Sequence, residues 1–483
     1  MKLAEYACHD AIGLADLVRD GQITPRELAA LVIEAVAAVN PAINAVIATF
    51  DERLEQLGDR PERPDAPLAG VPYLLKDLGA SEAGRVQEWG SRLCAGMLAE
   101  KTSYLIEKFQ RAGLVSLGRS AVPEFGVSIN TESVLTGSTS TPWNPEHIAG
   151  GSSGGAAAAV AAGIVPIAHA SDIGGSIRIP AHCCGVVGLK PTRGRTSIGP
   201  HMHDLPLGCM TEFINSRTLR DTAAVLDAVE GPGTGEGRTV PLPVRPFLEE
   251  LTLAPPRLRV ALMTASFDES TAVDSDVVAV TQSAGQLLRE MGHEVEETVF
   301  RFDYGAVAAA FATCFGALAV HVLDQMSAAS GRPLDETTLE PLMLWSYEQA
   351  RGTSAIELYE GYEQLTALRE TAGLFFESCD LLVTPTLPFP APRLGSFDPD
   401  PATRLQQEDV LAQFTWPFNV TGQPALSLPL GQSQSGLPIG VQLVGRFADE
   451  ATLFRVGARL EEELPWRGRV PPVHVSRTDA RNS

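Results

Sequence analysis

The chain has 483 residues, 44% of them apolar and 20% charged, a composition that supports a large buried core and excludes disorder along the whole length. Its 59 acidic and 37 basic residues give a net charge of -22, which disfavours binding to nucleic acids and anionic membrane surfaces. Because we find neither an apolar run of about 18 residues nor an apolar signal core at the N-terminus, we expect a soluble, cytoplasmic protein.

The cysteines and lysines limit the kinds of site that we expect in this chain. The seven cysteines are spread through the chain with neither a CxxC pair nor a histidine cluster beside them. This pattern predicts reduced, mostly buried thiols and no metal site. Only five of the 37 basic residues are lysines, so a lysine inside an apolar segment is a notable feature.

The first half of the chain alternates helices and strands. Residues 24–27, Thr-Pro-Arg-Glu, can cap a helix that we expect to run from 25 to 39. The stretch 126–155 is rich in Ser, Thr, Gly and Pro and predicts a long loop, and the Ala-rich residues 156–163 predict a helix. Apolar segments predict strands at 42–50, 70–79, 114–118 and 164–170.

The same alternation resumes after residues 230–257, which have the composition of a linker. Helices are expected at 274–291 and within 305–378, and strands at 258–264, 293–300, 380–385, 424–431 and 440–445. This order favours an α/β fold in which a central twisted mixed sheet is covered by helices on both faces. The pattern alone leaves open whether 230–257 separates two domains or crosses one sheet.

Two glycine-serine elements are the candidate catalytic segments of the chain. Gly150–Gly155, with the sequence GGSSGG, lacks the Lys-Ser/Thr ending of a P-loop and the spacing of a dinucleotide fingerprint, so taken alone it indicates a flexible turn. A second element, Asp172–Arg178 (DIGGSIR), follows the predicted strand at 164–170. Two Gly-Gly-Ser sequences therefore flank one helix-strand unit.

The segment from Gly150 to Arg195 resembles the signature of the amidase signature family. Segments at 70–78, 141–155, 380–392 and 417–445 resemble further parts of that family in the same order. The resemblance implies one amidase domain over 1–483 that hydrolyses a C–N bond without a metal or organic cofactor. We expect this domain to comprise an N-terminal helical region at about 1–65, a signature core at about 66–230 and a C-terminal α/β part at about 257–470.

Transferred to this sequence, the family's catalytic triad corresponds to Ser176 as nucleophile, Ser152 as bridging serine and Lys76 as base. The resemblance also implies a cis peptide bond between Gly151 and Ser152. A lysine can deprotonate a serine only when it is neutral, and the apolar neighbours of Lys76 predict burial that lowers its pKa. The alternative is a Lys76 paired with Asp77 or extended to the surface.

Backbone N–H groups of the second element can converge on the negative oxygen that forms during acyl transfer. We predict Ile173, Gly174, Gly175 and Ser176 as these donors; the alternative is an ordinary tight turn. Asp172 and Arg178 are expected to form a buried pair that supports the loop. The alternative is that Arg178 contacts a substrate carboxylate.

Ser153 is interpreted as a structural hydrogen-bonding residue. The chain departs from the commoner family sequence at Ser171, at His182-Cys183 and at Gly118-Arg119-Ser120, and none of these changes removes a triad residue. His182 is expected to be packed beside the sheet and not to act as a base.

Apolar residues in the loops around the site predict a pocket for the acyl group. Phe125, Trp143, Cys314 and Phe315 are the predicted substrate-binding residues, and Cys314 resembles a pocket cysteine of cyclic-amide hydrolases. The alternative for each of these four residues is that its side chain packs in the hydrophobic core. Further pocket candidates are Val127, Ile129, Phe311, Leu342 and Trp345.

The expected substrates are neutral small molecules: aryl or alkyl amides, oligoamides, or carbamates of the urethane type. The alternative is a glutamine-hydrolysing amidotransferase subunit that acts with a partner protein. Resemblance to that subfamily is weaker because Ile179 stands where it typically has glutamine. A homodimer is the assembly we consider for the amidase.

Overall fold

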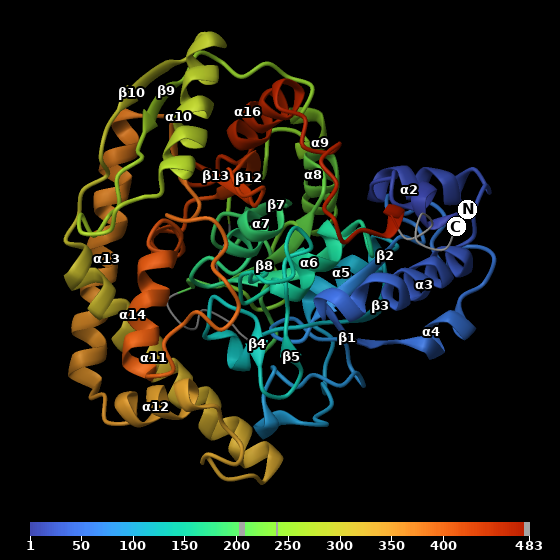
Figure 1. Ribbon diagram of the computed structural model, residues 1–483, viewed down its shortest axis with the longest axis horizontal. Coiled ribbons are helices and arrows are strands. Elements are labelled where there is room, and N and C mark those ends of the chain that lie inside the picture. Colours follow the sequence, from blue (N-terminus) through green and yellow to red (C-terminus); the bar gives the residue numbers. More distant parts are fainter. Residues whose placement is uncertain (202–207, 238–239, 478–483) are drawn as a thin grey trace.

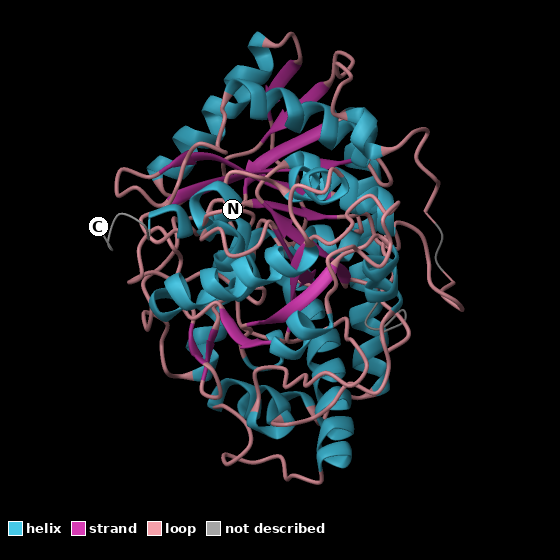
Figure 2. Ribbon diagram, turned by 90° about the vertical axis from the view of Figure 1, so that its right-hand side faces the viewer, coloured by secondary structure: helices cyan, strands magenta, loops and turns pink. Residues whose placement is uncertain are grey.

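The computed structural model describes residues 1–201, 208–237 and 240–477. Its centre is an 11-stranded sheet in the order β1-β3-β2-β6-β8-β7-β12-β13-β11-β9-β10. Figure 2 shows these strands running through the middle of the molecule with helices on both sides. The pairs β2/β3, β2/β6, β9/β10 and β9/β11 are parallel and the others antiparallel, so the sheet is mixed. The predicted fold class is confirmed.

Nine of the eleven strands of the central sheet overlap the segments predicted as strands from the sequence. Their bounds are β1 (Val46–Thr49), β2 (Pro72–Lys76), β3 (Val115–Ser120), β6 (Ile167–Asp172), β7 (Val187–Lys190), β8 (Thr211–Ser216), β9 (Arg259–Leu262), β10 (Glu294–Glu297), β11 (Leu381–Pro385), β12 (Ala425–Gln432) and β13 (Pro438–Gly445). The predicted closing hairpin is β12/β13. Sequence reasoning did not anticipate β7 and β8, which link the two halves of the sheet.

The N-terminal helices lie at one side of the molecule (Figure 1): α1 (Leu3–Tyr6), α2 (Ala11–Arg19), α3 (Pro25–Ile43) and α4 (Asp51–Gln56). The predicted capping box begins α3, because Thr24 accepts a hydrogen bond from the Glu27 N–H and the Glu27 side chain accepts one from Thr24. The helix continues past its predicted end to Ile43, and Asn44, with φ 48°, terminates it.

The predicted helix of small residues is α6 (Gly154–Ala161), and all eight of its residues are buried. A Cβ added at Gly155 would lie 2.3 Å from the backbone nitrogen of Ala121, so only glycine permits this close packing. The loop before α6 contains only the two-residue strands β4 (Glu132–Ser133) and β5 (Gly137–Ser138). The loop that carries Ser152 is thereby held against the sheet.

The remaining helices pack on the sheet or connect its strands. They are α5 (Tyr104–Arg111), α7 (Arg178–Cys184), α8 (Leu219–Val229), α9 (Phe247–Glu250), α10 (Ser275–Glu290), α14 (Pro401–Ala412), α15 (Trp416–Thr421) and α16 (Glu450–Glu463), with short 3-10 turns at Arg92–Cys94, Glu124–Gly126 and Val475–Arg477. The linker-like residues 230–257 lead from α8 to β9, and both halves contribute to the same sheet. The assignment of 1–483 to one domain stays a prediction.

A helical unit of α11 (Tyr304–Ser330), α12 (Pro341–Ala350) and α13 (Ala355–Ser378) lies on the side opposite the N-terminal helices (Figure 1). By length and composition α11 could cross a membrane, which corrects the expectation that no stretch of the chain qualifies. In this structure α11 packs against α12 and α13.

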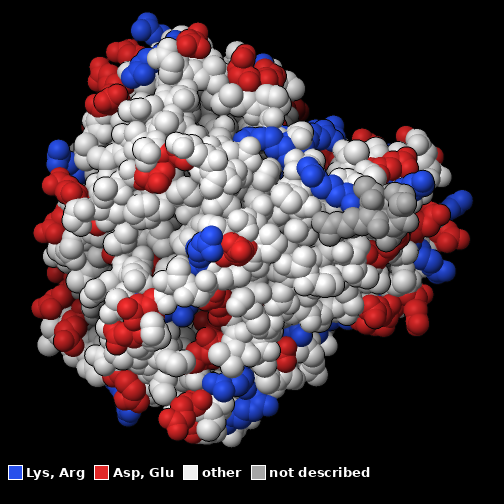
Figure 3. All heavy atoms as spheres, in the orientation of Figure 1, with Lys and Arg blue, Asp and Glu red and all other residues white. Residues whose placement is uncertain are grey.

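Charge is carried largely on the periphery. Figure 3 shows acidic side chains around the edges of one face, with basic side chains scattered among them and a largely uncharged centre. All seven cysteines are free, and each except Cys8 is buried, as the sequence predicted.

Candidate active site

Lys76 is the last residue of β2 and is fully buried. Its side-chain nitrogen Nζ lies 2.9 Å from Ser152 Oγ and 2.8 Å from Ser171 Oγ. Ser152 belongs to the loop before α6, and the peptide bond between Gly151 and Ser152 is cis. The fold thus brings a lysine and a serine that are 76 residues apart into direct hydrogen-bond contact.

The two glycine-serine elements lie beside each other. The Ser153 N–H donates to the carbonyl oxygen of Ser176 at 3.3 Å, which places the loop of Ser152 against the loop of Ser176. Ser153 Oγ donates to the carbonyl oxygen of Ser171 at 3.2 Å and accepts from its N–H at 3.3 Å. Its hydroxyl therefore ties the first loop to β6, while the side chain of Ser176 is partly accessible to solvent.

Burial lowers the pKa of Lys76 from 10.5 to about 7, against the opposing charges of Glu212 and Asp172. The alternative pairing with Asp77 does not form, because Asp77 is bound to Arg119 with an Nη1–Oδ1 distance of 2.7 Å. Lys190 is also buried with a pKa lowered to about 7, but its Nζ donates to the Pro191 carbonyl. Near neutral pH, Lys76 can therefore exist as a free amine in contact with Ser152.

The loop at Asp172–Arg178 is organised by a buried ion pair. Two hydrogen bonds of 3.0 and 2.9 Å join the Arg178 guanidinium to the Asp172 carboxylate, and both side chains are inaccessible to solvent. Asn419 donates to Asp172 Oδ1 at 2.8 Å. Burial alone would raise the pKa of Asp172, but the charge and hydrogen bonds of Arg178 lower it to about 2. Arg178 is thus enclosed and cannot reach a substrate carboxylate.

One of the four predicted oxyanion donors is already engaged. The Gly175 N–H donates to Asp172 Oδ1 at 2.8 Å, so it is not available to a substrate oxygen. Among the described residues, the N–H groups of Ile173, Gly174 and Ser176 have no acceptor. The expected set of donors is therefore reduced from four to these three in this structure.

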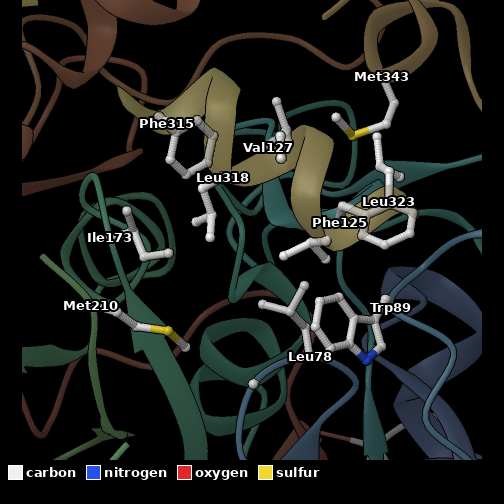
Figure 4. A pocket seen from close by; sticks show the side chains of 13 residues that line it. Leu78, Trp89, Phe125, Val127, Ile173, Met210, Phe315, Leu318, Leu323 and Met343 are labelled. Carbon is white, nitrogen blue, oxygen red and sulfur yellow. The ribbon is translucent and has the colours of Figure 1, made fainter. Parts of the chain in front are cut away.

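An apolar cavity lies beside Ile173, which belongs to the same loop as Ser176 (Figure 4). Three predicted pocket residues, Phe125, Val127 and Phe315, line it. The remaining lining residues come from the loop after β2, from the loop after β6 and the segment before β8, and from α11 and α12: Leu78, Gly79, Trp89, Ile173, Met210, Leu318, Ala319, Val322, Leu323 and Met343. Because Ile173 is also an unengaged N–H donor, the cavity adjoins the proposed site of the reaction.

Two of the four predicted substrate-binding residues lie elsewhere. The indole N–H of Trp143 donates to the Cys184 carbonyl at 2.8 Å, so this ring fastens its loop to α7. Cys314 is buried with its sulfur directed at Gly361 of α13, which makes it a core residue. Four further candidates also do not line the cavity: Ile129, Phe311, Leu342 and Trp345.

Sequence reasoning missed several of the contacts. Ser171 was noted only as a departure from the family sequence, yet it accepts a hydrogen bond from Lys76. Trp89 lines the cavity at a ring-centroid distance of 5.7 Å from Phe125. Trp89 and Phe125 have positive φ, 55° and 49°, a conformation that non-glycine residues adopt rarely.

His182 is buried in α7, and its Nδ1 accepts a hydrogen bond from the Gly440 N–H. Burial lowers its pKa to about 4. Among the described residues, its hydrogen-bond partner lies in β13 and not in the loops of Ser152 and Ser176, in agreement with a packing role. Within 1–201, 208–237 and 240–477, no group of three or more His, Cys, Asp or Glu side chains could hold a metal ion.

Comparisons with known proteins show which family the chain is similar to. A family model described as Amidase matches residues 27–454. The 6-aminohexanoate-cyclic-dimer hydrolase of Paenarthrobacter ureafaciens is 37% identical over 489 residues, covering 96% of each chain. A solved structure of a 6-aminohexanoate cyclic dimer hydrolase with substrate superposes with a TM-score of 0.90 at 35% identity, over 97% of this chain and 99% of that one.

A more distant solved structure is a Glutamyl-tRNA(Gln) amidotransferase subunit from Thermotoga maritima. It superposes with a TM-score of 0.76 at 25% identity, over 98% of each chain.

Proposed function

The chain belongs to the amidase signature family of amide-hydrolysing enzymes, and on this premise we propose that Ser176 attacks the carbonyl carbon of its substrate with Ser152 and Lys76 as the proton path. The observation that carries the proposal is the 2.9 Å contact between Lys76 Nζ and Ser152 Oγ in a fully buried setting. A serine hydroxyl is a weak nucleophile, so a neutral amine in contact with Ser152 can supply the base that Ser176 lacks through the bridging hydroxyl.

The first half of the reaction forms an acyl-enzyme. Ser176 loses its proton to Ser152, which passes its own proton to Lys76, and the Ser176 oxygen bonds to the carbonyl carbon. The N–H groups of Ile173, Gly174 and Ser176 stabilise the resulting oxyanion. The C–N bond then breaks, and the proton on Lys76 returns through Ser152 to the leaving nitrogen.

Water completes the cycle. It loses a proton along the same path to Lys76 and attacks the ester carbonyl of the acyl-enzyme. When this second tetrahedral intermediate collapses, the proton returns to the Ser176 oxygen and the carboxylic acid leaves. Every step uses groups of this chain, so we propose that neither a metal nor an organic cofactor takes part.

The substrate is proposed to be a neutral amide, oligoamide or carbamate whose acyl group is aryl or alkyl. The cavity lining is apolar, and a charged group buried there without a partner would cost several kcal/mol. The similarity to hydrolases of a cyclic amide dimer supports a neutral oligoamide among these substrates.

Glutamine hydrolysis for a partner protein is the second candidate, favoured by the similarity to the Thermotoga maritima amidotransferase. Glutamine carries a charged ammonium and carboxylate, and the cavity presents no ionised side chain to either of them. The amidotransferase reaction is therefore supported less well than hydrolysis of a neutral amide.

The test combines one variant with a substrate panel. Ser176→Ala should abolish turnover and labelling by a fluorophosphonate that reacts with activated serines, while Ser153→Ala should remain labelled. Aryl amides, aliphatic amides, cyclic amides and carbamates are then compared with glutamine by kcat/KM. Full labelling of Ser176→Ala would reject the nucleophile, and a wide preference for glutamine would transfer the assignment to the amidotransferase reaction.

A further inference from the structure

A buried histidine–glutamate pair lies directly behind Lys76 and has no part in the proton path described above. His169 is on β6 and Glu212 on the antiparallel neighbour β8, where Glu212 is opposite Ser171 in the register. His169 Nε2 and Glu212 Oε2 are 2.7 Å apart, and both side chains are buried. Ionisable groups are rarely buried unless they are paired, so the burial of these two side chains depends on their contact with each other.

The hydrogen bonds determine the protonation of the imidazole. The backbone N–H of Lys76 donates to His169 Nδ1 at 3.2 Å, so Nδ1 is an acceptor and carries no hydrogen. The single ring hydrogen is then on Nε2, from which it is donated to the Glu212 carboxylate. The imidazole is neutral, and the negative charge of Glu212 is left uncancelled by its hydrogen-bond partner.

The other charged groups around Lys76 are matched. Asp172 is paired with Arg178, and Asp77, on the far side of the strand, is paired with Arg119. Within the part of the chain that the structure describes, the hydrogen-bond partners of Lys76 Nζ are hydroxyl groups, those of Ser152 and Ser171. Among the described residues, Glu212 and Asp172 are the carboxylates whose charges act on Lys76, and Glu212 is the one without a cationic partner.

We propose that Glu212, oriented by His169, supplies the negative charge that stabilises Lys76 while it holds the proton taken from the serine pair. The inference rests on the proposed function, in which Lys76 is the base. Burial opposes the ammonium form, and in a site that excludes water an opposite charge stabilises it more strongly than in solution. Glu212 does not touch the reacting atoms; it is a positioning residue that acts through Lys76.

Replacing the carboxylate by its neutral isostere isolates the charge. In Glu212→Gln, the glutamine side chain has the same shape as glutamate and can still accept the hydrogen of His169 Nε2. It carries no charge, so it no longer attracts the ammonium form of Lys76. The pH at which Lys76 loses its proton should therefore fall by about one unit or more. The rate at alkaline pH should fall as well, because Lys76 accepts the proton less readily. Glu212→Asp retains the charge and should keep the midpoint close to that of the parent enzyme.

The experiment follows the rate at which a fluorophosphonate labels Ser176 from mildly acidic to alkaline pH. Labelling does not require knowledge of the natural substrate. The parent enzyme, Glu212→Gln, Glu212→Asp and Lys76→Ala are compared, with Glu450→Gln as a matched control. Glu450 is likewise buried, but it is paired with Arg195, so its replacement should leave the midpoint unchanged.

The outcomes separate the two proposals. If Lys76→Ala keeps the rising limb of the parent enzyme, Lys76 is not the base and the proposed mechanism fails. If Lys76→Ala loses that limb but Glu212→Gln titrates like the parent enzyme, the mechanism stands and the role of Glu212 is refuted. Should Glu212→Gln not fold, Glu212→Met removes the same charge and must shift the midpoint in the same direction; an unchanged midpoint there refutes the inference equally.

Discussion

Replacing Lys76 by methionine should remove a pH-dependent free-energy cost that the folded protein carries for burying this lysine. The pKa of Lys76 falls from 10.5 to about 7 on burial. Between these two values the unfolded chain binds a proton that the folded protein has released, so stability rises with pH across this window. Below about pH 7 both states hold the proton and the cost is fully present; above pH 10.5 both are neutral and the cost disappears.

The magnitude follows from the difference between the two pKa values. Each pH unit corresponds to about 1.4 kcal/mol, so lowering the pKa from 10.5 to about 7 costs about 5 kcal/mol at neutral and lower pH. Lys76→Met should therefore flatten the dependence of the unfolding free energy on pH by about 1.4 kcal/mol per unit within the window. Loss of the bonds to Ser152 and Ser171 changes the level of the curve but not this slope.

The assay is denaturant unfolding at a series of pH values between neutral and alkaline. Lys190→Met should flatten the curve by a similar amount, because Lys190 is also buried with a pKa near 7, but only Lys76→Met should abolish turnover. Lys101→Met, at an exposed position, should leave the slope unchanged. Identical slopes for Lys76→Met and the parent protein would show that Lys76 is charged in the folded state and refute the argument for a neutral base.

Three further outcomes are expected. Asp172→Asn should lower the unfolding free energy by about 3 to 5 kcal/mol in denaturant unfolding, since it leaves the buried Arg178 without its counter-charge; a loss under 1 kcal/mol would contradict this. Phe315→Ala should reduce kcat/KM for a neutral anilide about 10- to 150-fold, equivalent to losing about 1.5 to 3 kcal/mol of apolar contact, while Leu374→Ala, 61% exposed on α13, should have no effect; equal rates would place Phe315 outside the binding site. Prolonged chelation should leave the rate unchanged, and activity lost and then restored by zinc would oppose a metal-free reaction.

The sequence by itself determined the elements that depend on local chemistry. Apolar segments became strands, the capping box began α3, and Lys76 is buried in its apolar strand. The loops of Ser152 and Ser176 could be identified because each is bordered by glycines, and the Gly151–Ser152 bond is cis as the family resemblance implied. Signals of this kind lie within a few residues of one another, so they can be detected without knowledge of the fold.

Only the tertiary structure decided which side chains face the cavity. Cys314 and Phe315 are neighbours, but successive residues of an α-helix point about 100° apart, so Phe315 lines the cavity while Cys314 packs on α13. The apolar sequence around them predicted a place in the pocket for both residues. Trp143, predicted in the pocket, and Trp89, which was not predicted there, differ for a similar reason, since the partner of each indole is contributed by a distant segment.

Long-range strand pairing decided which charges surround Lys76. The Glu212–His169 contact joins strands whose residues are 43 positions apart, and β8 was not predicted from the sequence. The engagement of the Gly175 N–H by Asp172 likewise depends on a loop conformation that the motif permits but does not specify. Residue types determined what chemistry was possible here, whereas the charges and donors available to it were determined by the side chains that the folded sheet brought together.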